Sequence, residues 1–358
     1  MTRASGGRVE GPAARLRQAW SGRSGTAAAL LPLAAIYGAA TATRRCAYRI
    51  GALPTCRLPV PVVIVGNLVT GGAGKTPAVI AVVRLLQRHG WRPGIVSRGY
   101  GRESELLTVV DDATPVALGG DEPMLLRRRT GVPVVVAADR VAAGRALLAA
   151  DPAVDVIVAD DGLQHLALGR DVEVIVFDER GAGNGWLLPA GPLRERLPRR
   201  LAGHQIVLYN AGRASTPLPG FVGVRRLAGV VPLADWWRGA APDDAALDAL
   251  AGRPVTAAAG LADPDRFFAM LRARGLDLQT LPLPDHHDFR TVPWPTDSGD
   301  VVITEKDAVK LAPQRSTGAR VWVAALDFEP EPAFDAALLA RLPARSVEPS
   351  AHHGNPPA

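Results

Sequence analysis

The stretch that most constrains this chain lies at residues 61–77 and reads PVVIVGNLVTGGAGKTP. Its first part, Val62 to Val65, is a β-branched run typical of a buried strand. A glycine-rich turn follows and ends in Gly-Lys-Thr, after which residues 78–86 carry a helical pattern. Strand, glycine loop and helix in this order are the layout of a phosphate-binding P-loop.

This layout predicts how phosphate is held. Glycines let backbone N–H groups close around phosphate oxygens, and the helix N-terminus adds partial positive charge. We expect Lys75 to reach the β- and γ-phosphates of a nucleotide and Thr76 to hold Mg²⁺. Val69 stands where the usual pattern has its first glycine, so a plain glycine turn between strand and helix is the alternative. The predicted phosphate-binding residues are Gly71, Gly72, Ala73, Gly74, Lys75 and Thr76.

The use of lysine supports this interpretation. The chain has 41 Lys and Arg residues, of which three are lysines: Lys75, Lys306 and Lys310. One lies in the P-loop and two lie in TEKDAVK at residues 304–310. Arg and Lys differ in shape and hydration, so a site that needs a compact ammonium resists exchange. Chance placement of three lysines is the alternative.

Composition bounds the class of protein. With 358 residues and 47% hydrophobic content, the chain can bury a large core and is expected to form two domains. Residues 1–58 hold nine arginines and one acid, whereas the whole chain has a net charge of +6, so the remainder sums to −2. This nearly neutral body argues against a nucleic-acid surface. Cys46 and Cys56 show no metal-ligand spacing and no disulfide framework, which indicates a reducing cytoplasm.

The basic N-terminal segment contains an uncharged, alanine-rich stretch from Thr26 to Thr43. Arginines precede and follow this stretch, and those that follow it oppose export as a signal peptide. An apolar segment between arginine clusters suits a position in the surface of an anionic leaflet. We therefore predict that residues 1–58 associate with a membrane, with an ordinary core helix and a spanning helix as alternatives.

Further apolar runs predict the fold class. Strand candidates without polar alternation are separated by helical segments such as 139–150, which indicates parallel strands covered by helices on both faces. These strand candidates are residues 92–96, 132–137, 154–159, 172–177 and 205–209. We predict an α/β fold with a P-loop NTPase-like, mostly parallel sheet. The predicted parts are a kinase core at 59–220, a connector at 221–252 that begins with two strands at 221–233, a smaller C-terminal α/β domain at 253–342 and a disordered tail at 343–358.

Acidic residues stand at the end of one predicted strand and in one glycine-containing turn. Asp160 and Asp161 end an apolar strand, where a P-loop enzyme places the carboxylate that holds Mg²⁺. Asp121, in a Gly-Asp-Glu-Pro turn before a helix, is a candidate acid or a simple helix cap. The sequence lacks the Lys-x-Asp motif of guanine recognition, so ATP is favoured over GTP as the nucleotide.

Two loops carry further candidates. Arg98 and Tyr100 lie in a glycine-flanked loop after a predicted strand and could contact phosphate or stack on a ring. His286 and His287 follow Asp285 in a proline-rich loop, where further zinc ligands are missing and a solvated loop is the alternative.

Seven motifs in series resemble one family, the tetraacyldisaccharide 4'-kinases, which are the lipid A 4'-kinases of Gram-negative bacteria. The similarity covers roughly residues 15–342. The family's loop also lacks the first glycine of the general P-loop, whereas Leu163 stands where the family more often has Phe. The motifs are GGxGKTP at 71–77, SRGYG at 97–101, GDEP at 120–123, DDGxQH at 160–165, LPAGPLRE at 188–195, DHH at 285–287 and TEKDAVK at 304–310.

The resemblance implies phosphorylation, dependent on ATP and Mg²⁺, of the 4'-hydroxyl of a tetraacylated glucosamine disaccharide 1-phosphate, which gives lipid IVA. It implies a glycolipid substrate and a place on the cytoplasmic face of the inner membrane, peripheral or anchored by the N-terminal segment, with neither nucleic acid nor an obligate protein partner. Two other functions remain as alternatives. The first is a P-loop ATPase that acts on a protein partner, and the second is a membrane-bound scaffold whose nucleotide site is inactive.

The resemblance also implies roles for residues of the matching motifs. Lys75 and Thr76 handle the ATP phosphates and Mg²⁺, and Asp160 and Asp161 supply the carboxylates on the metal side. Asp121 matches the proposed catalytic base, paired with a histidine of the DHH motif that we take as His286. The remaining expected members of the nucleotide-binding active site are Arg98, Tyr100, Gln164, His165, Glu305 and Lys306.

Overall fold

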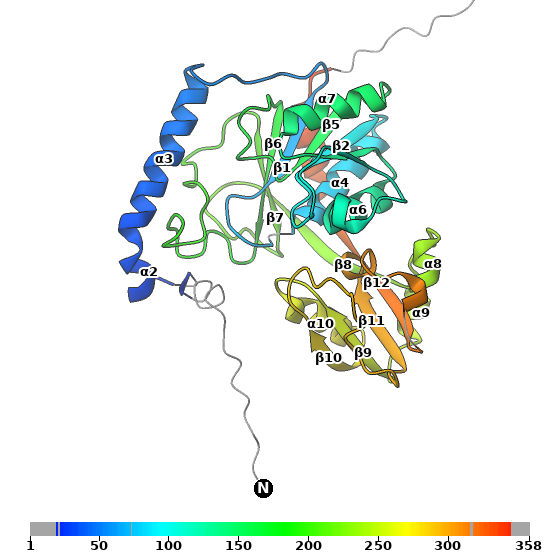
Figure 1. The fold of residues 1–358 in the computed structure, drawn as a ribbon. Helices are drawn as coiled ribbons and strands as arrows, with labels where there is room; N and C mark the ends of the chain where they lie inside the picture. Colours follow the sequence, from blue (N-terminus) through cyan, green and yellow to red (C-terminus); the bar gives the residue numbers. More distant parts are fainter. Residues whose placement is uncertain (1–18, 21, 73, 316–317, 345–358) are drawn as a thin grey trace, which may run out of the picture.

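A twelve-stranded sheet runs through the computed structural model, which describes residues 19–20, 22–72, 74–315 and 318–344. Its strand order is β10-β9-β11-β12-β8-β7-β6-β1-β5-β2-β4-β3. Figure 1 shows two units, an upper one around β1 and a lower one around β9 and β11, joined by β8 and β12. We call them the first and the second unit. The start of the expected N-terminal segment, Ala73 of the P-loop and the expected tail from residue 345 lie outside the described residues.

The first unit forms around strand β1, Val62–Gly66, all five residues of which are buried. Val63 and Val65 pack against α4, while Val62 and Ile64 face the opposite core, which includes α7. The other strands are β2 (Pro93–Ser97), β3 (Thr108–Val110), β4 (Val134–Val136), β5 (Val156–Asp160), β6 (Val172–Asp178) and β7 (Gln205–Asn210). The helices are α4 (Lys75–Arg88), α5 (Val116–Gly119), α6 (Asp121–Thr130) and α7 (Arg140–Ala150).

The predicted mostly parallel α/β sheet is confirmed. Strand β1 pairs in parallel with both β5 and β6, so the P-loop and Asp160 emerge at the same edge of the sheet. Antiparallel pairing occurs between β3 and β4 and between β8 and β12. Burial on both faces explains why these strands read as continuous apolar runs in the sequence.

The predicted two-stranded connector at residues 221–233 is wrong. The segment forms one long strand, β8 (Phe221–Pro232), which pairs with β7 only at its start. The rest of β8 pairs antiparallel with β12 (Arg320–Pro330), about a hundred residues further along the chain. A local sequence pattern cannot reveal such a distant partner strand. The two glycines within the segment, Gly223 and Gly229, are typical of a turn, which led to the prediction of two strands.

The second unit lies between these two long strands. Its helices and strands are α8 (Leu233–Trp237), α9 (Asp244–Asp248), β9 (Pro254–Ala259), α10 (Pro264–Ala273), β10 (Asp277–Pro282), β11 (Asp300–Thr304), α11 (Glu305–Ala308) and the 3-10 turn η1 (Pro313–Arg315). After β12 the chain returns to the first unit as α12 (Pro332–Leu339). There the Phe334 ring packs edge-on against Phe221 with the ring centroids 5.9 Å apart.

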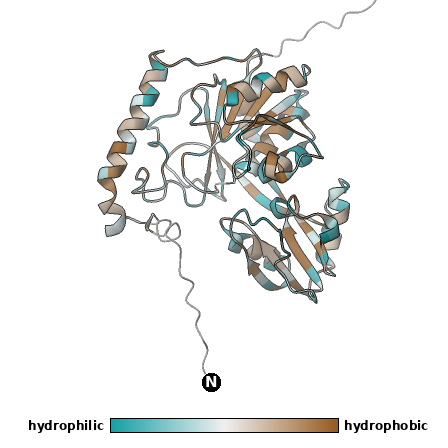
Figure 2. Ribbon diagram, in the orientation of Figure 1, coloured by the Kyte–Doolittle hydropathy of each residue, from teal (hydrophilic) through white to brown (hydrophobic). Residues whose placement is uncertain are grey.

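The described part of the N-terminal segment contains the helices α2 (Gly25–Ala29) and α3 (Leu31–Arg49), at the left of Figure 1. The Tyr37 hydroxyl donates to the Arg194 carbonyl at 2.9 Å, and Arg45 pairs with Glu195. Figure 2 shows apolar positions along α3, of which Leu33 and Ile36 are 54% and 67% exposed. An ordinary core helix would bury these side chains. Among the described residues, no helix combines the length and apolarity that a membrane crossing needs.

Arginines of the first unit fasten it to the second. Arg129, at the C-terminal end of α6, forms ion pairs with Glu305 of α11 and Asp327 of β12. Asp327 also accepts a hydrogen bond from Arg84 of α4 at 3.2 Å. Arg128 lies over the two tryptophan rings of α8 at 4.6 and 4.5 Å. The P-loop helix and the helix that begins with Asp121 therefore share one set of contacts with the second unit.

Replacing Arg129 tests this junction. Arg129→Leu leaves the buried Glu305 carboxylate without its cation, so we expect the free energy of unfolding to fall by about 3 kcal/mol. Urea unfolding measures this loss. The control is Arg88→Leu, because Arg88 pairs with Asp335 at 3.1 Å on the surface and its loss should cost below about 1 kcal/mol. Equal losses in the two variants would show that the Arg129 pair is not a fastening point.

Candidate active site

The P-loop follows β1 and ends at Gly74, the N-cap of α4, with φ of 73°. This left-handed conformation favours glycine. The Asn67 side chain donates to the Gly71 carbonyl at 3.2 Å and so ties the start of the loop to its middle. Lys75 Nζ lies 3.5 Å from Asn67 Oδ1 and 3.7 Å from Asp161 Oδ2. The loop therefore holds its lysine between an amide and a carboxylate, with Thr76 next in the first turn of α4.

Asp160 and Asp161 end β5 beside this lysine but differ in their surroundings. Asp160 accepts a hydrogen bond from the Ser97 hydroxyl at 2.9 Å, and its other oxygen, Oδ1, is buried without a partner. Burial, together with the charges of Glu122 and Asp161, raises the pKa of Asp160 to about 7. Asp161 accepts both its closest contacts from Arg194, at 3.0 and 3.2 Å. Although burial opposes it, Lys75 and Arg194 lower the pKa of Asp161.

These carboxylates fit a magnesium ion. Mg²⁺ takes oxygen ligands and is commonly held by one or two carboxylates together with substrate phosphates. The buried oxygen of Asp160 has no hydrogen bond to lose, and a cation there would offset the repulsion that raises its pKa. Asp161 already forms ion pairs with Lys75 and Arg194, so a metal ion bound to Asp161 would compete with these two partners.

A second group of charges lies where the two units meet. Asp121 is the first residue of α6, is 5% exposed, and pairs with His286 Nδ1 at 2.9 Å. The N-cap residue of the helix is Gly120, but Asp121 Oδ1 accepts a hydrogen bond from the backbone N–H of Glu122 at 2.9 Å, so Asp121 satisfies one N–H of the first turn while its other oxygen pairs with His286. Burial alone would raise the pKa of Asp121, but the His286 hydrogen bond and the charges of Lys306, His286 and Lys310 together lower it.

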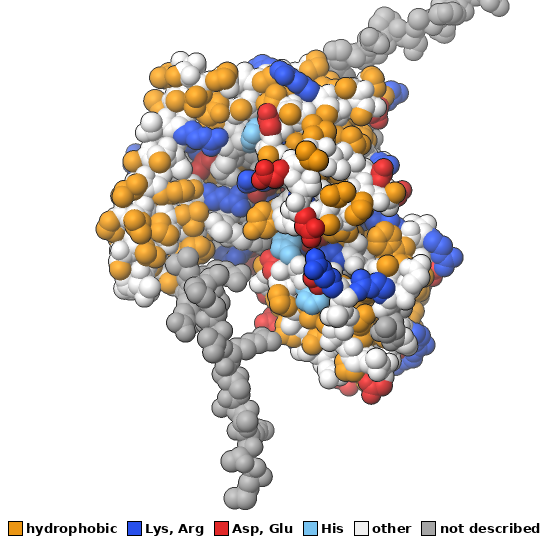
Figure 3. Space-filling view, in the orientation of Figure 1, with side chains coloured by type: hydrophobic (Ala, Val, Ile, Leu, Met, Phe, Trp, Pro, Cys, Tyr) orange, Lys and Arg blue, Asp and Glu red, His pale blue; other side chains and the backbone are white. Residues whose placement is uncertain are grey.

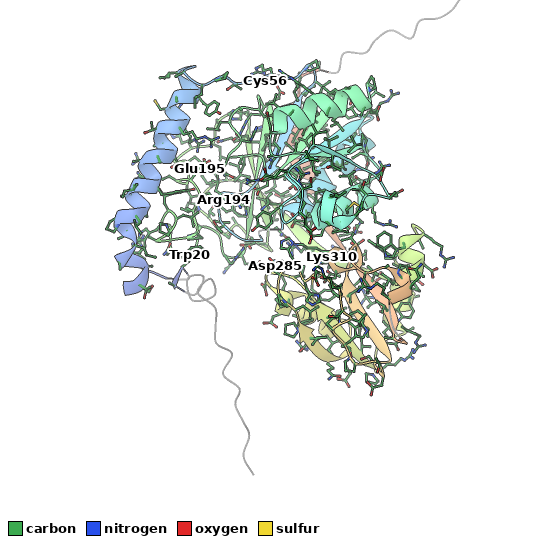
Figure 4. All side chains as sticks on the ribbon, in the orientation of Figure 1. Trp20, Cys56, Arg194, Glu195, Asp285 and Lys310 are labelled. Atoms are coloured by element: carbon green, nitrogen blue, oxygen red, sulfur yellow. The ribbon has the colours of Figure 1, made fainter. Side chains whose placement is uncertain are left out.

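Lys306 ties the same group together. Its Nζ lies 3.1 Å from Glu122 and 3.6 Å from Asp285, and 3.4 Å from His286 Nε2. Although burial opposes it, Glu122, Asp121 and Asp285 raise the pKa of Lys306, so the ammonium stays charged. Figure 3 shows histidine and charged side chains gathered between the units, and Figure 4 places Asp285 and Lys310 at that boundary.

The two groups of charges adjoin one another. Glu122 supplies the link, because its charge raises the pKa of Asp160 while its carboxylate holds Lys306. Tyr100, from the loop after β2, lies with its ring 5.7 Å from the ring of His286. The structure therefore brings most predicted residues to one region at the carboxyl edge of the sheet, where open α/β sheets bind ligands.

Three further predicted residues lie around this region. Gln164 accepts from Arg194 at 3.2 Å and donates to the Asn67 carbonyl at 3.4 Å, which places it beside the P-loop. His165 lies 3.5 Å from Asp139, and burial, helped by Arg140, lowers its pKa. Arg98 is exposed in the loop after β2.

Glu305 has a different environment from the one predicted. Its carboxylate is buried, pairs with Arg129 and accepts from the Trp236 indole at 3.3 Å. Burial raises its pKa in spite of Arg129. These contacts favour a part in joining the units over contact with a nucleotide.

The sequence predicted no individual role for several residues of the site, although the use of lysine had singled out Lys310. Asn67, Ser97 and Arg194 contact predicted members, and Lys310 lies 3.8 Å from Asp121. Ser97, Arg194 and Lys310 each stand inside one of the seven motifs that carry the family resemblance. Their place in these motifs was therefore the signal that could have identified them. Asn67 is a polar residue at the end of an apolar strand, which is a weaker signal.

Comparisons with known proteins agree with this geometry. The family described as LpxK, tetraacyldisaccharide-1-P 4'-kinase, matches residues 26–343. Tetraacyldisaccharide 4'-kinases of Methylibium petroleiphilum and Leptothrix cholodnii are each 57% identical, and the matches cover 90% and 93% of this chain and 92% and 97% of the relatives. A crystal structure of LpxK from Aquifex aeolicus in complex with ATP matches with a TM-score of 0.74 at 28% identity, covering 89% of this chain and all of that one. This chain therefore belongs to the tetraacyldisaccharide-1-P 4'-kinase family, and it is a kinase.

Proposed function

We propose that this protein transfers the γ-phosphate of ATP to the 4'-hydroxyl of a tetraacylated glucosamine disaccharide 1-phosphate, giving lipid IVA. The observation that carries the proposal is the pairing of buried Asp121 with half-buried His286, next to Glu122, whose charge acts on Asp160. Phosphoryl transfer needs a held polyphosphate, a group that orients the attacking hydroxyl, and stabilisation of charge. A P-loop ATPase also needs a group that orients its attacking water, so the phosphorylated product is what separates the two functions.

Asp121 is the group that accepts the proton of the acceptor hydroxyl. Its lowered pKa keeps the carboxylate ionised at neutral pH, ready to accept the hydroxyl hydrogen bond. His286 orients this carboxylate, and the hydrogen bond to Asp121 raises the pKa of His286 although burial opposes it. Because the transition state of phosphoryl transfer is loose, positioning contributes more than basicity.

The nucleotide side is assigned to the P-loop and the ends of β2 and β5. Lys75 and Thr76 hold the phosphates, with Asp161 and Asn67 orienting the lysine. Asp160 and Thr76 would hold Mg²⁺, which when bound would neutralise phosphate charge. Tyr100, Arg98, Gln164, His165 and Lys306 line the surrounding region.

Incubation with Mg²⁺, ATP and the lipid disaccharide tests the function directly. Mass spectrometry should show the gain of one phosphate on the lipid. In Asp121→Asn the turnover should fall about 10²-fold or more, while ATP binding and the melting temperature stay close to wild type. The control is Asp288→Asn in the same loop as His286, where the exposed Asp288 pairs with Arg290. ATP hydrolysis without a phosphorylated lipid would instead support the protein-directed ATPase.

The pairing of Asp121 with His286 predicts a shift in pH dependence. His286 helps to lower the pKa of Asp121, so His286→Gln should let that pKa rise. A base acts only when unprotonated, so as the pH falls the turnover of the variant should decline at a higher pH than that of wild type. Profiles of turnover against pH for both proteins measure this. An unchanged acid limb would show that a group other than Asp121 titrates.

We also propose that the protein works at the cytoplasmic face of the inner membrane, held there by α3. The exposed Leu31, Leu33 and Ile36 supply apolar contact, and the arginines of this segment supply charge for anionic lipid. This arrangement would let an acylated substrate reach the site without leaving the bilayer surface.

Sedimentation with anionic vesicles measures the association. Leu33→Ser/Ile36→Ser should reduce the bound fraction severalfold, because each apolar side chain contributes about 1.5–3 kcal/mol when buried. High salt should weaken the binding of wild type without abolishing it, since only the arginine part is screened. The control is Leu106→Ser, another exposed leucine far from α3 in the chain. Equal sedimentation of both variants would place the membrane contact elsewhere.

A further inference from the structure

The P-loop has a cationic neighbour that its motif does not include. Strand β8 pairs in parallel with β7 at Phe221 and Val222 and then runs on past the carboxyl edge of the sheet. Arg225 lies on this extension. Strands β6, β7 and β8 flank β1 on the side opposite to β5, so Arg225 and Asp160 approach the P-loop from opposite sides.

Arg225 packs directly on the P-loop. A Cβ added at Gly74 would overlap Arg225 Nη2 and the Asn210 side-chain amide, so the guanidinium occupies the space that any other residue at Gly74 would take. Gly74 is the N-cap of α4, a fourteen-residue helix whose first N–H groups and dipole favour an anion. The guanidinium therefore lies beside the most electropositive part of the loop.

Among the described residues this cation has no direct ion-pair partner, although the charges of Glu179, Asp178 and Asp263 act on it from a longer distance. Its Nε is buried without a hydrogen-bond partner, and among the described residues no carboxylate lies within ion-pair distance of the guanidinium. The arginines nearby are satisfied, because Arg180 pairs with Asp178 and Arg266 pairs with Glu179. Burial, together with the charge of Arg266, lowers the pKa of Arg225 to about 10 although Glu179 and Asp178 oppose this, so Arg225 remains charged at neutral pH. A partly buried cation without a direct ion-pair partner is costly unless an anion joins it, and Arg225 is of intermediate exposure.

We propose that Arg225 binds the polyphosphate of the nucleotide, as a second cationic ligand that faces Lys75 across the P-loop. The inference rests on the proposed use of this loop for ATP. A guanidinium suits the position because its planar fork can donate two parallel hydrogen bonds to phosphate oxygens, which an ammonium cannot. Arg180 helps to define this side of the loop, since it donates to the Gly72 carbonyl at 3.3 Å.

The alternative is that Arg225 only packs against Gly74 and keeps the loop in shape. Binding of Mg·ADP and of AMP, each measured by calorimetry without lipid, separates the two. In Arg225→Met the affinity for Mg·ADP should fall about ten-fold or more while that for AMP changes little, because the contact is to phosphates beyond the first. The KM for ATP should rise to match, with the KM for the lipid unchanged.

The neighbouring residue provides the control. Arg226→Met removes an arginine that lies on the surface 3.8 Å from Glu329, and it should leave nucleotide binding as in wild type. Arg225→Lys keeps the charge but not the fork, so its affinity for Mg·ADP should fall between wild type and Arg225→Met. It also serves as the test variant if Arg225→Met does not fold.

Several outcomes would overturn the inference. They are wild-type affinity for Mg·ADP in both Arg225 variants, an equal loss for AMP and Mg·ADP, or no binding of Mg·ADP to wild type. If wild type binds Mg·ADP but never phosphorylates the lipid, the proposed function fails while the role of Arg225 still stands or falls on the calorimetry. Lower thermal stability with unchanged affinity would support the packing role.

Discussion

The site depends on the meeting of Asp121 and Glu122, at the N-terminus of α6, with Lys306 and His286 from the second unit. Two adjacent acids at a helix N-terminus are favoured by the helix dipole, but Asp121 is almost fully buried and needs cations to stay ionised. Those cations all come from the other unit. The active form of the first unit is therefore completed electrostatically by the second, and neither unit contains the acid and its partners alone.

The placement of lysine follows from the same requirement. Each of the three lysines lies beside site carboxylates: Lys75 by Asp161, Lys306 by Glu122, and Lys310 by Asp121 and Asp307. A guanidinium is broader and carries a fixed fork, so it would not fit between several close acceptors in the same way. By contrast, the contacts that join the units through Arg129 reach two separate carboxylates, which suits a fork.

Features that depend on residues close together in the chain could be predicted from the sequence, whereas contacts between distant segments could not. The P-loop, the acids at the end of β5 and the buried parallel strands are local patterns, and the structure has them where the patterns predicted. The pairing of β8 with β12, the contact of Arg194 with Asp161 and the packing of Arg225 on Gly74 join segments far apart in the chain. Periodicity carries no information about such contacts. Glu305 illustrates the same limit, because its motif suggested a ligand contact and only its partners, Arg129 and Trp236, reveal another part.

The return of the chain through α12 has a consequence for folding order. Phe334 and Leu338 of α12 are fully buried in the same core as β1 and the P-loop helix, and β12 covers the long edge of β8. During synthesis from the N-terminus, the first unit would leave the ribosome with this part of its core uncovered. It could close only after residue 339 had emerged, once the whole second unit had been made. We therefore expect that the first unit cannot complete its folding as a separate domain during translation, because its core is completed only when almost the entire chain has been made.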